Sequence, residues 1–265
     1  MHSAYQIEGL ESWAPEAFME IGRQSEKNAS DAVTNSIDRF VRPNGSVDAA
    51  TMMEDWFPNI AADVFISHCR ADKDTALALS GWLKDNFGLS PFIDSCVWNH
   101  AHDLIRLLDD KYCQTGVNTY SYSGSLVTAS HVHLMLSTAL TKMMDRCECI
   151  FFLRTPNSIG SKCPEKMVNG DPTSTYSPWL FHEIAMMKLL RIRTKDQHRS
   201  GEKLTELSEG VSKSVSVPSF TYPAELSGIP TLNRRDLIQW ESAMAKTAVK
   251  RIHPLDLLYK TAGPG

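Results

Sequence analysis

The amino-acid sequence predicts an α/β fold, in which a parallel sheet has helices on both faces. From residue 63 onward, short and almost wholly apolar segments alternate with longer segments of helical periodicity, as at 63–67, 76–87 and 149–153. Such apolar runs are typical of strands that are covered on both faces of a parallel sheet. Their alternation with helices indicates right-handed crossovers. The chain of 265 residues, 42% of them hydrophobic, is long enough for one large domain with an appendage.

The first part of the chain reads as helical and carries no cluster of catalytic side chains. Apolar residues recur at helical intervals over 14–41, which predicts one amphipathic helix. A second, short helix is expected at 46–57, with Ser46 as its N-cap. We therefore expect residues 1–57 to form an N-terminal helical extension that packs on the main domain or on a second copy of the chain.

Within the main domain, residues 61–265, the expected elements have local signals. Gly88 ends the helix expected at 76–87, and apolar side chains recur at helical spacing in the helix expected at 131–147. Strands are expected at 63–67, 90–94, 149–153 and 215–220, and helices at 76–87, 104–112, 131–147, 179–190, 233–240 and 253–259. Residues 96–130 are rich in Gly, Ser and Tyr and too long for a compact connection, so we expect an insertion there.

Charge and hydropathy exclude several classes of partner. The net charge is −4 and the pI is near 6.1, so the chain lacks the basic surface of a nucleic-acid-binding protein. No apolar run approaches the roughly 18 residues of a membrane-spanning helix. The first residues lack the apolar region of a secretory signal. We therefore expect a cytoplasmic protein that binds neither nucleic acid nor membrane.

The six cysteines are expected to be reduced, because structural disulfides belong to secreted proteins. Cys147 and Cys149 are closer together in the sequence than the cysteine pairs of structural zinc sites. His131 and His133 could ligate a metal ion, but no third and fourth ligand are evident. We therefore expect no metal site and no bound cofactor.

Polar residues follow three of the predicted strands. Ser67 and His68 follow the first, Asp94 and Ser95 the second, and residues 155–157 the third. Ligands of open parallel sheets bind beyond the carboxyl ends of the strands, so these residues are expected at one edge. The next helix carries Trp179 and Glu183, four positions apart and therefore on one helix face. An aromatic ring beside a carboxylate would suit a flat, cationic, sugar-bearing ligand such as a dinucleotide.

Four segments resemble, in order, the motifs of TIR (Toll/interleukin-1 receptor) domains. Residues 63–68 with 72–74 are similar to the first strand and loop, and residues 90–95 to the second strand. Residues 149–153 and 177–183 resemble the third strand and the Trp-x-x-x-Glu helix. The likeness extends over residues 61–191 and loosely to 265, and is closest to stand-alone bacterial members. It implies a flavodoxin-like parallel sheet, the TIR fold.

The resemblance implies cleavage of NAD+, as a substrate, at the bond between nicotinamide and ribose. Glu183 stands where the enzymatic members carry their catalytic glutamate. Because nicotinamide leaves as a neutral group, a single carboxylate can stabilise the oxocarbenium-like transition state. Trp179 would then stack on the nicotinamide or ribose, and Arg70 would pair with the pyrophosphate. Ser67 and His68 would line the pocket as polar contacts.

The segment after the second strand corresponds to the BB loop of the family, and three of its residues are further candidates for substrate binding: Asp94, Ser95 and Trp98. Each polar candidate also has a structural explanation. His68 could cap a turn, Arg70 could be a solvated charge, and Asp94 could simply end its strand. Trp98 could pack within the loop, and the 96–130 insertion puts a direct transfer of BB-loop roles in doubt.

Family members without activity act as interaction modules that assemble, so a non-catalytic scaffold is the alternative. In both cases the resemblance implies a homo-oligomer formed through the BB-loop region, with a downstream effector protein that the sequence does not identify. The biological role, defence or stress signalling in bacteria, follows from the resemblance alone. A phosphotransfer receiver is disfavoured because Ser67 and His68, rather than an acidic cluster, follow the first predicted strand. The product, linear, cyclic or conjugated ADP-ribose, is left open.

Overall fold

The computed structural model describes residues 1–30, 37–93, 95–160, 173–199, 222–247 and 252–263. Its centre is a five-stranded sheet, and every neighbouring pair of strands in it is parallel. Along the inner strands of the sheet, successive apolar side chains enter two separate cores. In strand β6 (Cys149–Leu153), Phe151 lies in one core and Phe152 in the other. The expected α/β architecture with a parallel sheet covered on both faces is therefore confirmed.

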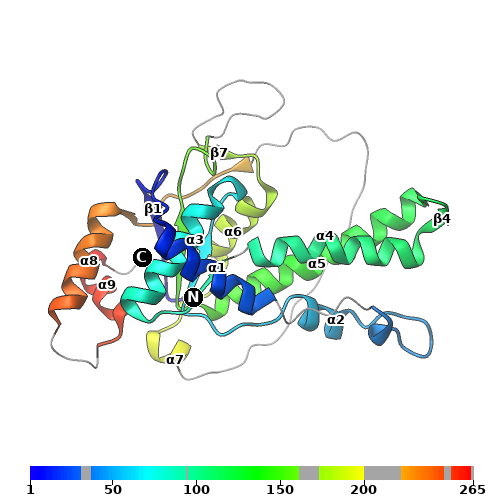
Figure 1. The fold of residues 1–265 in the computed structure, drawn as a ribbon, viewed down its shortest axis with the longest axis horizontal. Helices are drawn as coiled ribbons and strands as arrows, with labels where there is room; N and C mark the ends of the chain where they lie inside the picture. The colour runs from blue at the N-terminus through cyan, green and yellow to red at the C-terminus, as the bar shows by residue number, and fades with distance from the viewer. Residues whose placement is uncertain (31–36, 94, 161–172, 200–221, 248–251, 264–265) are drawn as a thin grey trace.

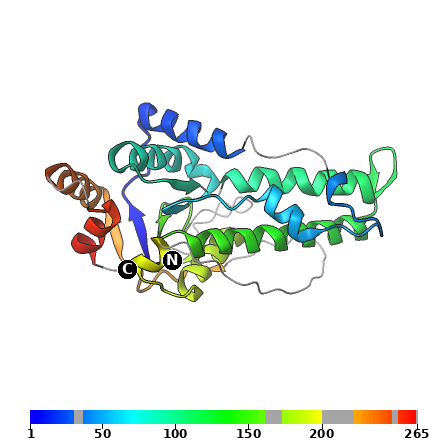
Figure 2. The ribbon, with the colours of Figure 1, turned by 90° about the horizontal axis from the view of Figure 1, so that it is seen from below.

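Different helices cover the two faces. One core contains side chains of α3 (Lys73–Phe87), α8 (Arg234–Lys246) and α9 (Pro254–Ala262). The opposite core contains side chains of four helices: α2 (Ala49–Trp56), α4 (Ser95–Tyr112), α5 (Tyr122–Arg146) and α6 (Pro178–Leu189). Figure 2 shows α1 (Glu16–Ser30) and α3 on one side of the sheet and α5 on the other. Among the described helices, none is both long and apolar enough to cross a lipid bilayer.

The strand order is β3 (Pro91–Ile93), β2 (Val64–Ser67), β6, β1 (Ser3–Glu8) and β9 (Thr231–Asn233). This arrangement is compatible with the flavodoxin-like order 2-1-3-4-5, with the N-terminal strand in fourth place. The expectation that residues 1–57 form only a helical extension is therefore wrong at residues 3–8. The fourth strand expected at 215–220 lies outside the described residues, and the place beside β6 is occupied by β1.

Strand β1 escaped detection because its buried side chains are partly polar. Ser3 and Gln6 are both buried, so the segment is not an apolar run. The Gln6 side-chain amide is accommodated by donating hydrogen bonds to the carbonyl oxygens of Leu226 (3.2 Å) and Ile229 (2.7 Å). A polar group in the interior is tolerated when it is hydrogen-bonded in this way.

Helix α1 (Glu16–Ser30) is shorter than the helix expected at 14–41. Residues 38–40 form a separate 3-10 turn, η1 (Asp38–Phe40), after which Val41 pairs with Val47 around a turn. The short helix expected at 46–57 is α2 (Ala49–Trp56), and its N-cap is Asp48 rather than Ser46. The Asp48 carboxylate accepts a hydrogen bond from the Thr51 amide (3.1 Å), whereas the Ser46 hydroxyl bonds the Asn44 side chain.

The insertion expected at 96–130 is part of a helical arm that extends away from the sheet (Figure 1). The arm consists of α4 (Ser95–Tyr112), a hairpin of β4 (Gln114–Gly116) and β5 (Thr119–Tyr120), and α5 (Tyr122–Arg146). No long loop follows β3, since α4 begins at Ser95, so the expected BB loop is replaced by a helix. Helical spacing of the buried side chains of Leu104 and Leu108 explains this outcome.

The remaining elements complete the described chain. Gly88 ends α3 in the left-handed conformation (φ +64°), as its position predicted. The other elements are the 3-10 turn η2 (Arg70–Asp72), α6 (Pro178–Leu189), α7 (Lys195–Arg199) and an antiparallel pair, β7 (Ser174–Thr175) with β8 (Tyr222–Pro223).

Candidate functional site

The carboxyl ends of β2 and β6 lie side by side in the centre of the sheet. After β2 the chain forms β3, which lies on one side of β2, whereas β6 lies on its other side. The chain connections that leave β2 and β6 therefore run in opposite directions along the sheet. Ligands of open α/β sheets bind at such a switch point. Ser67 ends β2 and His68 follows it, and residues 155–158 follow β6. Two of the three strand ends expected to form the site therefore meet.

Glu183 from α6 reaches this edge of the sheet and contacts Ser67. The Ser67 hydroxyl donates a hydrogen bond of 2.5 Å to Oε2 of Glu183. Helix α6 is held at its start by the Ser177 hydroxyl, which accepts a hydrogen bond from the Leu180 amide (3.2 Å). Glu183 lies on the buried stripe of the helix with Leu180, Ile184 and Met187, and its exposed fraction is 0%. A carboxylate on an apolar stripe is costly to bury, and hydrogen bonding lowers that cost.

Trp179 lies one turn before Glu183 and is half-buried. Its indole packs against the core on the α5 side of the sheet and meets the His133 ring edge-on, with the ring centres 5.8 Å apart at 70°. Burial, together with the neighbouring His102, lowers the pKa of His133 below its ordinary value, which favours the neutral ring. The predicted stacking of Trp179 on a ligand remains a prediction.

His68 and Arg70 have different surroundings although two positions separate them. His68 is buried, with 3% of its surface exposed, whereas Arg70 is exposed in η2. Arg70 forms no ion pair with any described residue, which leaves its guanidinium available to an anionic group. Asp94 lies outside the described residues, as do the side chains of Ser95 and Trp98, so their predicted contacts with substrate remain predictions.

Asp72 has a role that sequence reasoning missed. Its buried carboxylate accepts hydrogen bonds from the Thr155 hydroxyl (2.6 Å) and from the side-chain amide of Asn157 (2.8 Å). The Thr155 amide in turn donates to the Ser158 hydroxyl (2.9 Å). Asp72 therefore ties the loop after β2 to the loop after β6. The sequence did contain a signal for this contact. Asp72 follows β2 and Asn157 follows β6, and residues after neighbouring parallel strands lie at the same edge of the sheet.

Burial keeps two of the described thiols, those of Cys147 and Cys149, unreactive. Cys69, Cys113, Cys147 and Cys149 form no disulfide bonds. Burial raises the pKa of Cys147 to about 12 and that of Cys149 well above its ordinary value, so both remain protonated thiols. Within the described part of the chain, no three His, Cys, Asp or Glu side chains converge as metal ligands.

The central edge of the sheet therefore combines an oriented, buried carboxylate, a hydroxyl donor and a cross-braced pair of loops. No model of a protein family matches the sequence, and comparisons with curated proteins and with solved structures found no match either. The function of the chain is inferred from its own residues and their geometry.

Proposed function

We propose that this protein is a TIR-type enzyme that cleaves NAD+ at the nicotinamide–ribose bond, with Glu183 as its catalytic carboxylate. One observation carries the proposal. The Ser67 hydroxyl holds the Glu183 carboxylate, at 2.5 Å, beside the carboxyl end of β2, where open parallel sheets bind ligands. Ser67 belongs to the segment that resembles the first TIR strand, and Glu183 to the Trp-x-x-x-Glu helix.

The proposed reaction needs little proton transfer. The bond between the ribose C1′ and the nicotinamide nitrogen breaks, and the electron pair leaves with nicotinamide, which becomes neutral. Positive charge then develops on the ribose, where the Glu183 carboxylate stabilises it. Water attacks C1′ and releases a proton to give ADP-ribose, or a nitrogen of the same molecule attacks to give a cyclic product. Ser67 fixes the orientation of the carboxylate throughout.

Access to Glu183 is the step that assembly would control. The side chain has an exposed fraction of 0%, so substrate reaches the carboxylate only when surrounding groups move aside. We propose that contacts between copies of the chain, through the region around α4, favour the open arrangement. The cytoplasm is the proposed location, in keeping with the reduced state of Cys113, Cys147 and Cys149. A bacterial defence or stress-signalling role is the proposed setting.

The test is NAD+ consumption by the purified chain. Glu183→Gln retains the shape of the side chain but removes its charge, and should lower turnover by about 10²–10³. Glu54→Gln is the matched control. Glu54 is an exposed glutamate on α2, the helix that precedes β2 in the chain, and it does not belong to the Ser67–Glu183 pair. Glu183→Gln with turnover close to that of the unaltered chain would rule the mechanism out.

A non-catalytic scaffold that signals by self-assembly is the second candidate, and the helical arm favours it. Val117 at the arm's hairpin is 91% exposed and Tyr122, at the start of α5, is 69% exposed. Exposed apolar side chains gathered at the end of a projection are typical of interaction surfaces. Light scattering and the NAD+ assay on one sample separate the candidates: assembled protein without turnover would identify a scaffold.

A further inference from the structure

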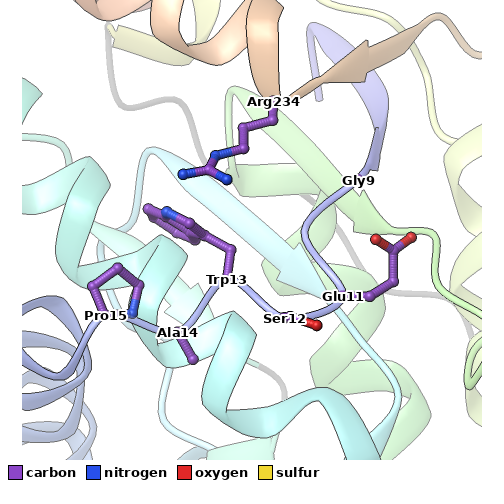
Figure 3. Close-up of a pocket in the computed structure, with 7 residues that line it drawn as sticks. All are labelled: Gly9, Glu11, Ser12, Trp13, Ala14, Pro15 and Arg234. Atoms are coloured by element: carbon purple, nitrogen blue, oxygen red, sulfur yellow. The ribbon is translucent and has the colours of Figure 1, made fainter.

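A depression lies at the carboxyl edge of the sheet, away from Glu183. It follows β1 and borders the start of α8, and its volume is about 480 Å³ (Figure 3). Strand β6 separates β1 from β2, so this depression and the Ser67–Glu183 pair belong to different halves of the sheet edge. Ligand sites of a few hundred cubic ångström are typical for small molecules.

Trp13 forms a fixed wall of this depression. Its indole packs against Phe18, with ring centres 6.0 Å apart, and meets Trp82 edge-on at 6.3 Å. These contacts hold the ring from the core side, and the residue is only half-buried. Gly9 has a positive φ of +74°, and this turn directs residues 11–15 along the rim. An aromatic ring that is already immobilised loses little entropy when a flat ligand stacks on it.

Two opposite charges also line the depression. Arg234, the first residue of α8, extends toward the Trp13 indole (Figure 3), and Glu11, which is exposed, is the acidic residue among those that line the depression. Neither side chain forms an ion pair with any described residue. By contrast, the neighbouring Arg154 and Glu8 neutralise each other at 2.8 Å. Arg234 and Glu11 therefore remain available for a ligand.

The start of α8 itself is closed to anions. The Asn233 side chain accepts hydrogen bonds from the amides of Arg235 (2.8 Å) and Asp236 (3.3 Å). The Asp236 carboxylate accepts one from the Asn233 amide (2.8 Å), which completes a capping box. The amides of Asn233, Arg235 and Asp236 at the helix start are thus occupied, and the Arg234 guanidinium remains to contact an anion.

We propose that this depression binds a nucleoside monophosphate. The base stacks on Trp13, the phosphate pairs with the Arg234 guanidinium, and the Glu11 carboxylate accepts hydrogen bonds from the ribose hydroxyls. Each contact matches a part of the ligand: a ring for the base, a planar cation for the phosphate and an anionic acceptor for the diol. The site does not depend on NAD+ cleavage, because none of its residues belongs to the Ser67–Glu183 pair.

Isothermal titration of the full chain with AMP tests the proposal. We expect saturable binding of one AMP, weakened about tenfold by Arg234→Gln through loss of a charge-assisted contact. Glu11→Gln should weaken binding less, and Arg235→Gln, the neighbouring exposed arginine, is the matched control and should leave it unchanged. Adenosine and inorganic phosphate should each bind more weakly than AMP, because each lacks one of the two main contacts.

Three results would overturn the proposal. The first is absence of saturable AMP binding. The second is equal affinity for AMP and for inorganic phosphate, which would indicate an anion site without base recognition. The third is AMP binding that Arg234→Gln leaves intact but Glu183→Gln abolishes, which would place AMP at the other site. Since the titration contains no NAD+, its failure is separate from failure of the proposed enzymatic function.

Discussion

At the scale of single residues, the contact between Ser67 and Glu183 decides what the site can do. A carboxylate buried on an apolar helix stripe is stable only while hydrogen-bond donors face it. Ser67 supplies such a donor from the end of β2 at 2.5 Å. The same hydroxyl that stabilises the fold therefore also orients the proposed catalytic group, so stability and activity depend on one contact.

Ser67→Ala should weaken both properties together. Loss of a donor to a buried carboxylate should lower the free energy of unfolding by about 1–3 kcal/mol. NAD+ turnover should fall as well, because the carboxylate is no longer held in one orientation. Urea denaturation and the NAD+ assay measure the two effects, with Ser130→Ala, on the exposed face of α5, as the control. Unchanged stability would contradict the hydrogen bond as described.

Asp72→Asn tests the brace between the two loops. The carboxylate accepts from both Thr155 and Asn157, whereas an amide oxygen carries no charge and its NH2 group cannot accept. The free energy of unfolding should fall by about 1–2 kcal/mol. Asp74→Asn, an exposed neighbour on α3, should change it by less than about 0.5 kcal/mol. Equal effects of the two substitutions would argue against the brace.

At the scale of elements, α1 and α3 approach each other through two glycines. A Cβ atom added at Gly22 would lie 2.2 Å from the Leu77 carbonyl oxygen, and one added at Gly81 would lie 1.9 Å from that of Phe18. Glycine costs helix stability in general, so two glycines at a helix crossing indicate that the backbones need this closeness. The described part of the N-terminal region is thus fitted to the main domain.

Gly22→Ala and Gly81→Ala should each destabilise the protein. On an open helix surface the change to alanine stabilises by up to about 1 kcal/mol. Here the helices must separate, and overpacking of this kind costs about 1–3 kcal/mol. Thermal and urea unfolding give the sign of the effect, and Ala17→Ser, exposed on α1, is the control. A stabilising Gly→Ala change would show that the close approach is absent.

Elements with a strong local signal were predictable from the sequence. Elements that depend on contacts with residues far away in the chain were not. The apolar run at 149–153 and the Gly88 stop led directly to β6 and the end of α3. Strand β1 was missed because the hydrogen bonds that make Gln6 acceptable come from residues 226 and 229. In the site, Ser67 and Glu183 were both foreseen as contributors, but their direct contact depends on how α6 packs against β2.

At the scale of the whole molecule, charged residues join distant parts of the chain near the amino end of β6. This end of the sheet is opposite the edge that holds the Ser67–Glu183 pair. Arg199 in α7 bonds Glu148, just before β6, at 2.9 and 2.8 Å. Arg199 and Lys195 also bond Asp256 in α9. Although partial burial opposes it, these hydrogen bonds hold the pKa of Asp256 below its ordinary value.

Stability should therefore decline in acid partly through Asp256. Because the pKa of Asp256 is lower in the folded state, its contribution is present above the unfolded value of about 3.9 and is lost as the pH falls through the folded value. Asp256→Asn should lower the free energy of unfolding at pH 7 and leave a smaller difference from the unaltered chain near pH 3. Urea denaturation at the two pH values measures this. A constant difference would exclude Asp256 as a source of the pH dependence.

Assembly should govern the proposed activity, since Glu183 is buried in the single chain. Specific activity should rise with protein concentration over about a hundredfold range, together with the assembled fraction seen by light scattering. Val117→Ser and Tyr122→Ser, at the exposed end of the helical arm, should reduce both, whereas Leu189→Ser, exposed on α6, is a control for loss of apolar surface elsewhere. Constant specific activity from a monomer at every concentration would contradict this dependence.

The place of β1 in the sheet has a consequence for how the chain is made. Its two neighbours are β6, at residues 149–153, and β9, at residues 231–233. During synthesis β1 leaves the ribosome before β6 and β9, and both of its edges are unpaired until these distant strands emerge. Pairings over such long sequence separations form slowly and leave strand edges open to other chains. The nascent chain should therefore depend on chaperones until β9 has been translated.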